Sequence, residues 1–166
     1  TAFELAQKYN FRKFIILVPS IAIKEGVKSS IDSMREHFRE IYPNLPFDTN
    51  VYDGKSPEVV QSFATSTNMQ FMIMTIQSIK GDSSNRIFHQ ERDKLNGIAP
   101  VDFMAATNPV VIMDEPQNME GDLSGGAIEK LSPMCTLRYS ATHVREYNMM
   151  YRLDPVDAHR EKLVKG

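Results

Sequence analysis

The side chains best suited to chemistry in this chain are two adjacent carboxylates, Asp114 and Glu115. They follow an apolar run, residues 110–113, which is bounded by Pro109 and Pro116. A short apolar run without polar alternation is typical of a parallel strand that is buried on both faces. The carboxylates would then lie at the carboxyl end of a strand, where open α/β sheets bind their ligands. Two acids there can hold a magnesium ion and direct a water molecule at a phosphate, so nucleotide hydrolysis is the first hypothesis.

A simpler interpretation of the same two acids stays open at this point. A strand that ends in Asp-Glu can serve only to cap the following helix and to place negative charge at its first turn. Acidic residues are common at such positions. The acids alone therefore do not decide between catalysis and capping.

Hydroxyl side chains follow a second predicted strand, residues 136–139, in the sequence Ser140-Ala141-Thr142. Hydroxyls at a strand tip beside a carboxylate can pass hydrogen bonds from a phosphate site to a neighbouring surface. Ser-Ala-Thr alone is equally typical of an ordinary turn. A third apolar run, residues 14–18, ends at Pro19-Ser20.

The order of these motifs resembles the first RecA-like motor lobe of superfamily-two helicases and translocases. Within that group, the chain is similar to the restriction (Res) subunit of type III restriction–modification enzymes. The resemblance covers nearly the whole chain. Each motif alone is weak evidence for the family, but their order and spacing together are fairly specific. It is carried by residues 18–27, 113–119, 139–143 and 152–158.

The resemblance implies a role in ATP hydrolysis for each of three residues. Asp114 would hold Mg²⁺, directly or through a water molecule, and Glu115 would be the general base that activates the attacking water. Gln117 would sense the phosphate end of ATP and help to couple this lobe to a second RecA-like lobe of the same polypeptide.

The resemblance also implies a relay and a DNA-tracking surface. Ser140 and Thr142 would border the nucleotide and relay its state to the DNA-facing side. The residues expected near the nucleic-acid backbone are Pro19, Ser20, Thr75 and Gln77.

The expected fold is α/β: a three-layer, RecA-like (P-loop NTPase-type) parallel sheet with helices on both faces. Alternation of predicted strands and helices supports a parallel sheet with right-handed crossovers. One domain is expected over residues 1–166. We predict helices at 1–9, 27–41, 57–67, 101–107 and 127–131, strands at 14–18, 47–52, 71–75, 110–113, 136–139 and 149–153, and loops at 81–85 and 121–126.

The phosphate-binding loop of such an ATPase, Gly-x-x-x-x-Gly-Lys-Ser/Thr, is not found in this sequence. The only Gly-Lys-Ser occupies residues 54–56, where Thr49 stands in place of the first glycine, and a simple turn explains it better. In the resembled family, this loop precedes a helix like residues 1–9. We therefore expect the chain to be a fragment of the ATP-binding lobe that lacks this loop and is inactive in isolation.

The composition excludes several classes of protein. Nineteen Lys and Arg against 21 Asp and Glu give a net charge of −2. A free-standing nucleic-acid-binding domain is usually basic, but this charge still allows contact with DNA through backbone amides and hydroxyls. No apolar run approaches the roughly 20 residues of a membrane helix, and one cysteine excludes an internal disulfide, so we expect a cytoplasmic protein without a membrane partner. Four scattered histidines lack the spacing of zinc ligands, and no Gly-x-Ser-x-Gly motif indicates a serine hydrolase.

The leading hypothesis is a hydrolase: the ATP-dependent, Mg²⁺-dependent DNA translocase or helicase-type motor lobe of a type III restriction endonuclease. Its implied partners are double-stranded DNA and a modification (methyltransferase) subunit, with the nuclease domain elsewhere. The alternatives are the motor lobe of a type I restriction enzyme or of another superfamily-two DNA helicase, and a non-catalytic α/β interaction module. The sequence Asp-Glu-Pro-Gln favours type III.

Overall fold

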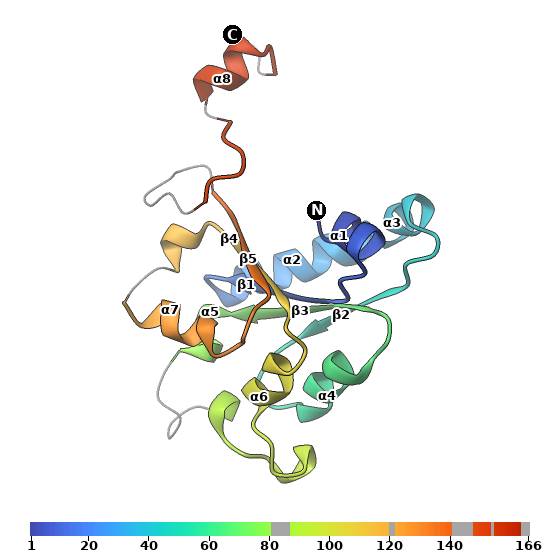
Figure 1. Ribbon diagram of the computed structural model, residues 1–166, viewed down its shortest axis with the longest axis vertical. Helices are drawn as coiled ribbons and strands as arrows, with labels where there is room; N and C mark the ends of the chain where they lie inside the picture. Colours follow the sequence, from blue (N-terminus) through green and yellow to red (C-terminus); the bar gives the residue numbers. More distant parts are fainter. Residues whose placement is uncertain (81–86, 120–121, 141–147, 154, 164–166) are drawn as a thin grey trace.

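Five parallel strands form a single sheet in the order β2-β3-β1-β4-β5 (Figure 1). This computed structural model describes residues 1–80, 87–119, 122–140, 148–153 and 155–163. The strands are β1 (Lys13–Val18), β2 (Phe47–Val51), β3 (Met69–Thr75), β4 (Val110–Asp114) and β5 (Cys135–Tyr139).

The two strands at the centre of the sheet, β3 and β1, come from the most apolar runs of the chain. All seven residues of β3 and the last five residues of β1 are buried. Side chains of a strand alternate between the two faces. Accordingly, Ile15 and Leu17 belong to one hydrophobic core, whereas Phe14, Ile16 and Val18 belong to a second core on the opposite face.

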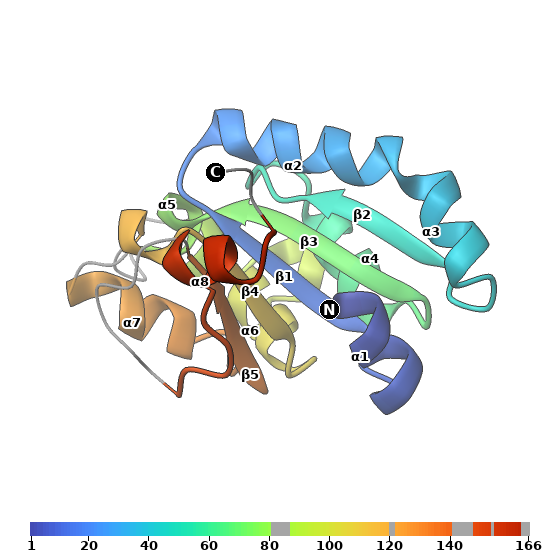
Figure 2. The same cartoon turned by 90° about the horizontal axis from the view of Figure 1, so that it is seen from above.

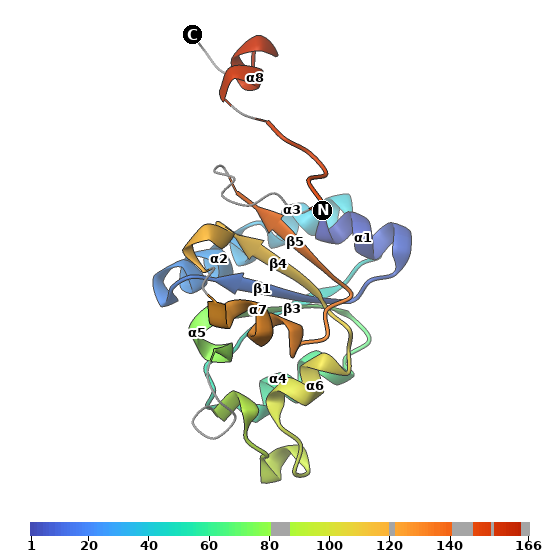
Figure 3. The same ribbon diagram turned by 60° about the vertical axis from the view of Figure 1, so that its left-hand side comes forward.

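Helices cover both faces, which confirms the expected three-layer arrangement (Figures 2 and 3). None of the described helices combines the length and the apolar character that a membrane span requires. One face carries α1 (Ala2–Tyr9), α2 (Ile21–Ser33) and α3 (Arg35–Ile41), and the other carries α4 (Pro57–Thr65), α5 (Ile76–Ile79), α6 (Pro100–Ala105) and α7 (Asp122–Glu129). The short 3₁₀ turns are η1 (Ile87–His89), η2 (Asp93–Leu95) and η3 (Pro116–Asn118), and α8 (Pro155–Arg160) stands apart from the body at the end of an extended arm (Figure 1).

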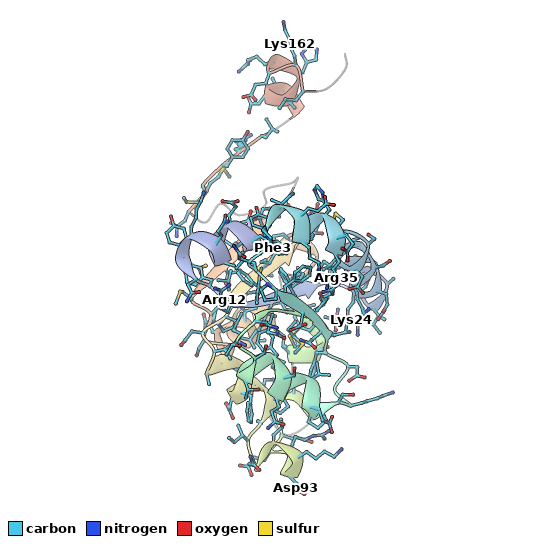
Figure 4. The ribbon with its side chains drawn as sticks, turned by 90° about the vertical axis from the view of Figure 1, so that its right-hand side faces the viewer. Phe3, Arg12, Lys24, Arg35, Asp93 and Lys162 are labelled. Atoms are coloured by element: carbon cyan, nitrogen blue, oxygen red, sulfur yellow. The ribbon has the colours of Figure 1, made fainter. Side chains whose placement is uncertain are left out.

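The predicted helix 27–41 is two helices rather than one, with the break at Met34. Met34 has φ −91° and ψ 5°, and the Ser33 hydroxyl donates to the Ser30 carbonyl at 2.9 Å just before it. Serine side chains that bond to nearby backbone carbonyls are known to bend helices. Beyond the break, Arg35 donates to the Phe47 carbonyl at 3.0 Å and lies over the Phe47 ring (Figure 4). These contacts fix α3 against β2.

The predictions around residues 121–131 were wrong in their boundaries. A loop was expected at 121–126 and a helix at 127–131, whereas α7 begins at Asp122 and ends at Glu129. Gly125 and Gly126 lie inside this helix, although each glycine costs about 1 kcal/mol there relative to alanine. Ala127 and Leu131 are buried in the core, so packing outweighs that propensity.

The strand predicted at residues 149–153 is also wrong, because the structure gives this segment no strand. Its residues are exposed, Met150 by 93%, and they have no sheet neighbour in the described part of the chain. A strand needs a partner for its backbone groups as well as apolar side chains. The loop predicted at 81–85 lies outside the described residues.

A polar network around one buried side chain, Gln70, joins β2 to β3. Gln70 is fully buried, and its amide donates to Asp48 at 2.7 Å and to Ser66 at 3.0 Å while it accepts from Asn50 at 2.9 Å. A satisfied network of this kind specifies one strand register, because a shift would leave buried polar groups without partners.

We predict that Ile15→Ala lowers the free energy of unfolding by about 2–5 kcal/mol, because Ile15 is fully buried between β3 and β4. The matched control is Ile21→Ala, which removes the same atoms from a side chain that is 68% exposed. This change should alter the free energy of unfolding by less than about 0.5 kcal/mol. Urea unfolding of both variants measures the difference. Equal losses would contradict the assignment of β1 to the centre of the sheet.

Candidate active site at the carboxyl edge of the sheet

All five strands end at one edge of the sheet, hereafter the carboxyl edge, because they are parallel. The registers pair Val18 with Thr75 and Asp114 with Tyr139, so the strand ends lie level with one another. Along this edge the segments that follow β2, β3, β1, β4 and β5 begin at Tyr52, Ile76, Pro19, Glu115 and Ser140. The predicted site residues that the structure describes therefore gather at one edge. Thr142 lies outside the described residues.

Asp114 and Glu115 are placed side by side at the end of β4 but in different environments. Asp114 is exposed, and its carboxylate has no hydrogen bond or ion pair within the described part of the chain. Glu115 is half-buried, and its amide donates to the Tyr139 carbonyl at 2.8 Å, which extends the β4–β5 pairing by one bond. Its backbone then turns into the left-handed region, with φ 52° and ψ 58°.

Glu115, Gln117 and Ser140 form a hydrogen-bonded group, hereafter the Glu115 cluster. The Gln117 amide donates to Oε2 of Glu115, and the Ser140 hydroxyl lies 2.8 Å from Oε1 of Gln117 and 3.4 Å from Oε2 of Glu115. Oε1 of Glu115 has no protein partner among the described residues. One carboxylate oxygen is thus held in place while the other is available to accept a proton from a water molecule.

The capping interpretation of the two acids is not supported by this geometry. Glu115 occupies the position before η3, yet its side chain makes no capping hydrogen bond. Its carboxylate faces Gln117 and Ser140 instead.

The expected DNA-contact residues differ in accessibility. Ser20 and Gln77 are exposed and Pro19 is half-buried, whereas Thr75 is only 6% exposed. The Thr75 hydroxyl lies 2.8 Å from that of Ser78, so Ser78 is its partner at the start of α5. Ser20 caps α2, since its hydroxyl accepts from the Ile23 amide at 3.3 Å. The structure brings these residues to the same edge as the Glu115 cluster, at and just after the ends of β1 and β3.

Tyr139 makes a side-chain contact beside the candidate site that sequence reasoning missed. Its hydroxyl donates to Oγ1 of Thr1 at 2.7 Å and so ties the start of α1 to the end of β5, next to Ser140. The only signal in the sequence was its position directly before Ser140, and spacing cannot reveal a contact across 138 residues.

The residues present fit a magnesium ion that is bound together with a phosphorylated ligand. Mg²⁺ takes one or two carboxylates and substrate phosphates and keeps several waters. Asp114 supplies one exposed carboxylate whose oxygens are not used elsewhere among the described residues. In that part of the chain, no group of three or more His, Cys, Asp or Glu side chains could form a metal site by itself.

Comparison with known proteins gives a consistent family. Residues 1–145 match the family model described as "Type III restriction enzyme, res subunit". The chain is 30% identical, over 184 aligned positions, to the Res subunits of the type III restriction-modification enzymes EcoP15I of Escherichia coli and EcoPI of Escherichia phage P1. Both alignments cover 100% of this chain and 19% of the relative, so the chain spans about a fifth of their length. It is 29% identical to the StyLTI Res subunit of Salmonella typhimurium, over 99% of this chain and 20% of that protein.

We predict that Glu115→Gly is more stable than Glu115→Ala by about 1 kcal/mol. Both changes remove the carboxylate and its hydrogen bonds, but only glycine removes the Cβ that disfavours a left-handed backbone. Urea unfolding of the two variants gives the difference directly.

The control for this prediction is the same pair of changes at Glu25, an exposed residue inside α2. There the order should reverse, because glycine is less favourable than alanine in a helix by about 1 kcal/mol. The same order at both sites would show that Glu115 does not have the left-handed conformation.

Proposed function

This chain belongs to the res-subunit family of type III restriction enzymes, and on that premise we propose that it is the ATP-hydrolysing motor lobe of such a subunit. The observation that carries the proposal is the Glu115 cluster beside the exposed Asp114 at the carboxyl edge. Because the chain spans only 19% of two relatives, the lobe would act as part of a longer protein.

The proposed chemistry is attack of water on the terminal phosphate of ATP. Phosphoryl transfer depends mainly on positioning and on neutralising charge. Mg²⁺ bound with the triphosphate supplies much of that neutralisation, and Asp114 would hold it directly or through water. Glu115 would orient the attacking water and accept its proton at the carboxylate oxygen that the Glu115 cluster leaves free. Gln117 and Ser140 would keep that carboxylate in one orientation.

The crossover geometry supports a phosphate-binding loop supplied by residues that precede α1 in the full protein. The connection from β1 through α2 to β2 moves along the sheet away from β5, and α1 lies on the same face as α2. Since such connections are right-handed, a strand leading into α1 would lie on the β5 side of β1. β4 and β5 already occupy that side, so the strand would lie beyond β5, whose outer edge has no strand beside it in the described part of the chain. A loop from its carboxyl end would arrive beside Thr1, Tyr139 and Ser140.

The remaining part of the proposal concerns DNA and the other parts of the enzyme. Ser20 and Gln77 are exposed at the same carboxyl edge as the Glu115 cluster, after β1 and β3, which suits contact with a nucleic-acid backbone. Pro19 and Thr75 would shape this surface, and Ser140 with Thr142 would relay the nucleotide state to it. We propose double-stranded DNA as the polymer, with a modification subunit and a second RecA-like lobe as partners in the cytoplasm.

We predict that Glu115→Gln in the full-length protein lowers ATP turnover by at least about 100-fold while ATP binding persists. The amide keeps the size of the side chain but cannot accept the proton of the attacking water, and general bases contribute about 10²–10⁴ in rate. Turnover is measured as phosphate release and binding by fluorescence titration with a labelled nucleotide.

The control for turnover is Glu129→Gln, which neutralises an exposed carboxylate at the end of α7. It should hydrolyse ATP like the unaltered protein. Normal turnover in Glu115→Gln would remove Glu115 from the mechanism and leave the proposed function without its main support.

A further inference from the structure

A side-chain contact joins the segment after β3 to the segment that carries the Glu115 cluster. In the sheet, β1 stands between β3 and β4, so these two strands are not paired with each other. Beyond the strand ends, however, the Lys80 ammonium donates to the Met119 carbonyl at 3.3 Å. This hydrogen bond spans 39 residues of sequence and links the end of α5 to the end of η3. The proposed function gives it no role.

α5 has an exposed polar side chain on one side and a buried apolar side on the other. Gln77 is exposed, whereas Ile76 and Ile79 are buried and belong to the same hydrophobic core as Met119. α5 also lies beside α7, the helix that follows η3 in the chain (Figure 3). A ligand that touches Gln77 would therefore act on an element that packs in the same core as the end of η3.

Hydrogen bonds hold α5 and Lys80 together as one unit. Nε2 of His89 lies 3.0 Å from the Ile79 carbonyl oxygen, which fixes the last residue of the helix. The Lys80 amide donates to the Ile76 carbonyl at 3.1 Å, so the backbone of Lys80 continues the helical turn. Because these bonds leave the segment little internal freedom, a displacement at Gln77 would also displace Lys80.

η3 is by contrast a single 3₁₀ turn. Its closing hydrogen bond runs from the Met119 amide to the Pro116 carbonyl at 2.9 Å. The hydrogen-bond geometry of a 3₁₀ turn is poorer than that of an α-helix, so contacts from outside contribute more to its position. Glu115 directly precedes this turn, and Gln117 lies inside it. The position of the Glu115 cluster therefore depends on what holds the end of η3.

The α5 segment holds Met119 through both its side chain and its backbone. The Met119 side chain is buried in the core that contains Ile76 and Ile79, and its carbonyl accepts from the half-buried Lys80. A hydrogen bond from an ammonium is charge-assisted and stronger than one between neutral groups. Lys80 thus ties the turn that carries Gln117 to the segment that carries Gln77.

We propose that Lys80 is a positioning residue through which DNA contact at Gln77 acts on the Glu115 cluster. This inference rests on the proposed function, because it concerns how DNA would regulate ATP hydrolysis at that same site. Contact with a nucleic-acid backbone would displace or fix α5, and the hydrogen bond from Lys80 to Met119 would carry the change to η3. Lys80 itself touches neither ATP nor the attacking water. Coupling between two binding sites is reciprocal, so bound nucleotide should change DNA affinity by the same route.

The first test compares ATP turnover of the full-length protein with and without a duplex oligonucleotide, at saturating ATP. Lys80→Met keeps the apolar stem of the side chain but removes the ammonium. It should lower the ratio of the two rates towards one, by about 2–30-fold, the range expected when a residue that links two sites is changed. Lys80→Arg keeps a cation that can donate to the Met119 carbonyl and should retain most of the ratio. The matched control is Lys130→Met, which changes an exposed lysine after α7 and should leave the ratio unaltered.

The second test is a binding measurement that a purely structural role would not affect. DNA affinity is measured by fluorescence anisotropy with and without Mg²⁺ and a non-hydrolysable ATP analogue. The two affinities should differ in the unaltered protein, and the difference should shrink in Lys80→Met while the melting temperature stays nearly the same. A lower melting temperature with an unchanged difference would make Lys80 a structural residue and rule out the proposed coupling.

Other outcomes separate this inference from the proposed function. An unaltered turnover ratio in Lys80→Met, or an unaltered protein that hydrolyses ATP and binds DNA without any effect of one on the other, would overturn the inference alone. Equal losses in Lys80→Arg and Lys80→Met would also count against it, because the hydrogen bond to Met119 would then not be what couples the sites. Failure of the unaltered protein to hydrolyse ATP or to bind DNA would contradict the proposed function itself.

Discussion

Parallel pairing of β4 with β1 and β5 is the constraint on which the rest of this molecule depends. It sets the carboxyl ends of the strands level, and the bond from the Glu115 amide to the Tyr139 carbonyl carries that alignment one residue beyond the sheet. Ser140 is consequently within reach of Glu115 and Gln117, although 23 residues separate it from Gln117. A shift of one residue in β5 would place Ser140 elsewhere and turn every β5 side chain to the opposite face. The buried Gln70 network stabilises the register of the neighbouring strands β2 and β3 near their amino ends.

The carboxyl edge also contains three departures from ordinary local rules. Glu115 adopts a left-handed backbone without being glycine. The Asp114 carboxylate is exposed, the Tyr52 hydroxyl is buried, and neither has a hydrogen-bond partner among the described residues. Natural proteins tend to concentrate such exceptions at functional sites, since a stable core can tolerate a few unfavourable groups there. Tyr52 itself belongs to one of the two cores, which are otherwise apolar apart from a few polar groups that have hydrogen-bond partners.

Apolar runs predicted the strands well, and burial explains why. The apolar runs at residues 14–18, 71–75 and 110–113 are uninterrupted because each strand is covered by helices on both faces of the sheet. The same burial that stabilises these strands therefore produces the pattern that predicts them. The start of α7 before two glycines depended on tertiary packing that no local pattern contains, whereas the break at Met34 follows a local bond between Ser33 and Ser30. The hydrogen bonds of the Glu115 cluster and the Tyr139–Thr1 contact both join distant segments. The order of the motifs could predict that these residues lie at the same edge of the sheet, but not which hydrogen bonds they form.

The central claim is that the paired acids at the end of β4 work on the terminal phosphate of a bound nucleotide. The most direct test is a structure of the full-length protein with Mg²⁺ and a non-hydrolysable ATP analogue. The account predicts that Asp114 binds the metal at about 2.0–2.1 Å or through one of its waters. It also predicts that Glu115 contacts, at about 3 Å, a water facing the terminal phosphate. A nucleotide bound away from the carboxyl edge, with Asp114 and Glu115 touching neither metal nor water beside it, would contradict the account.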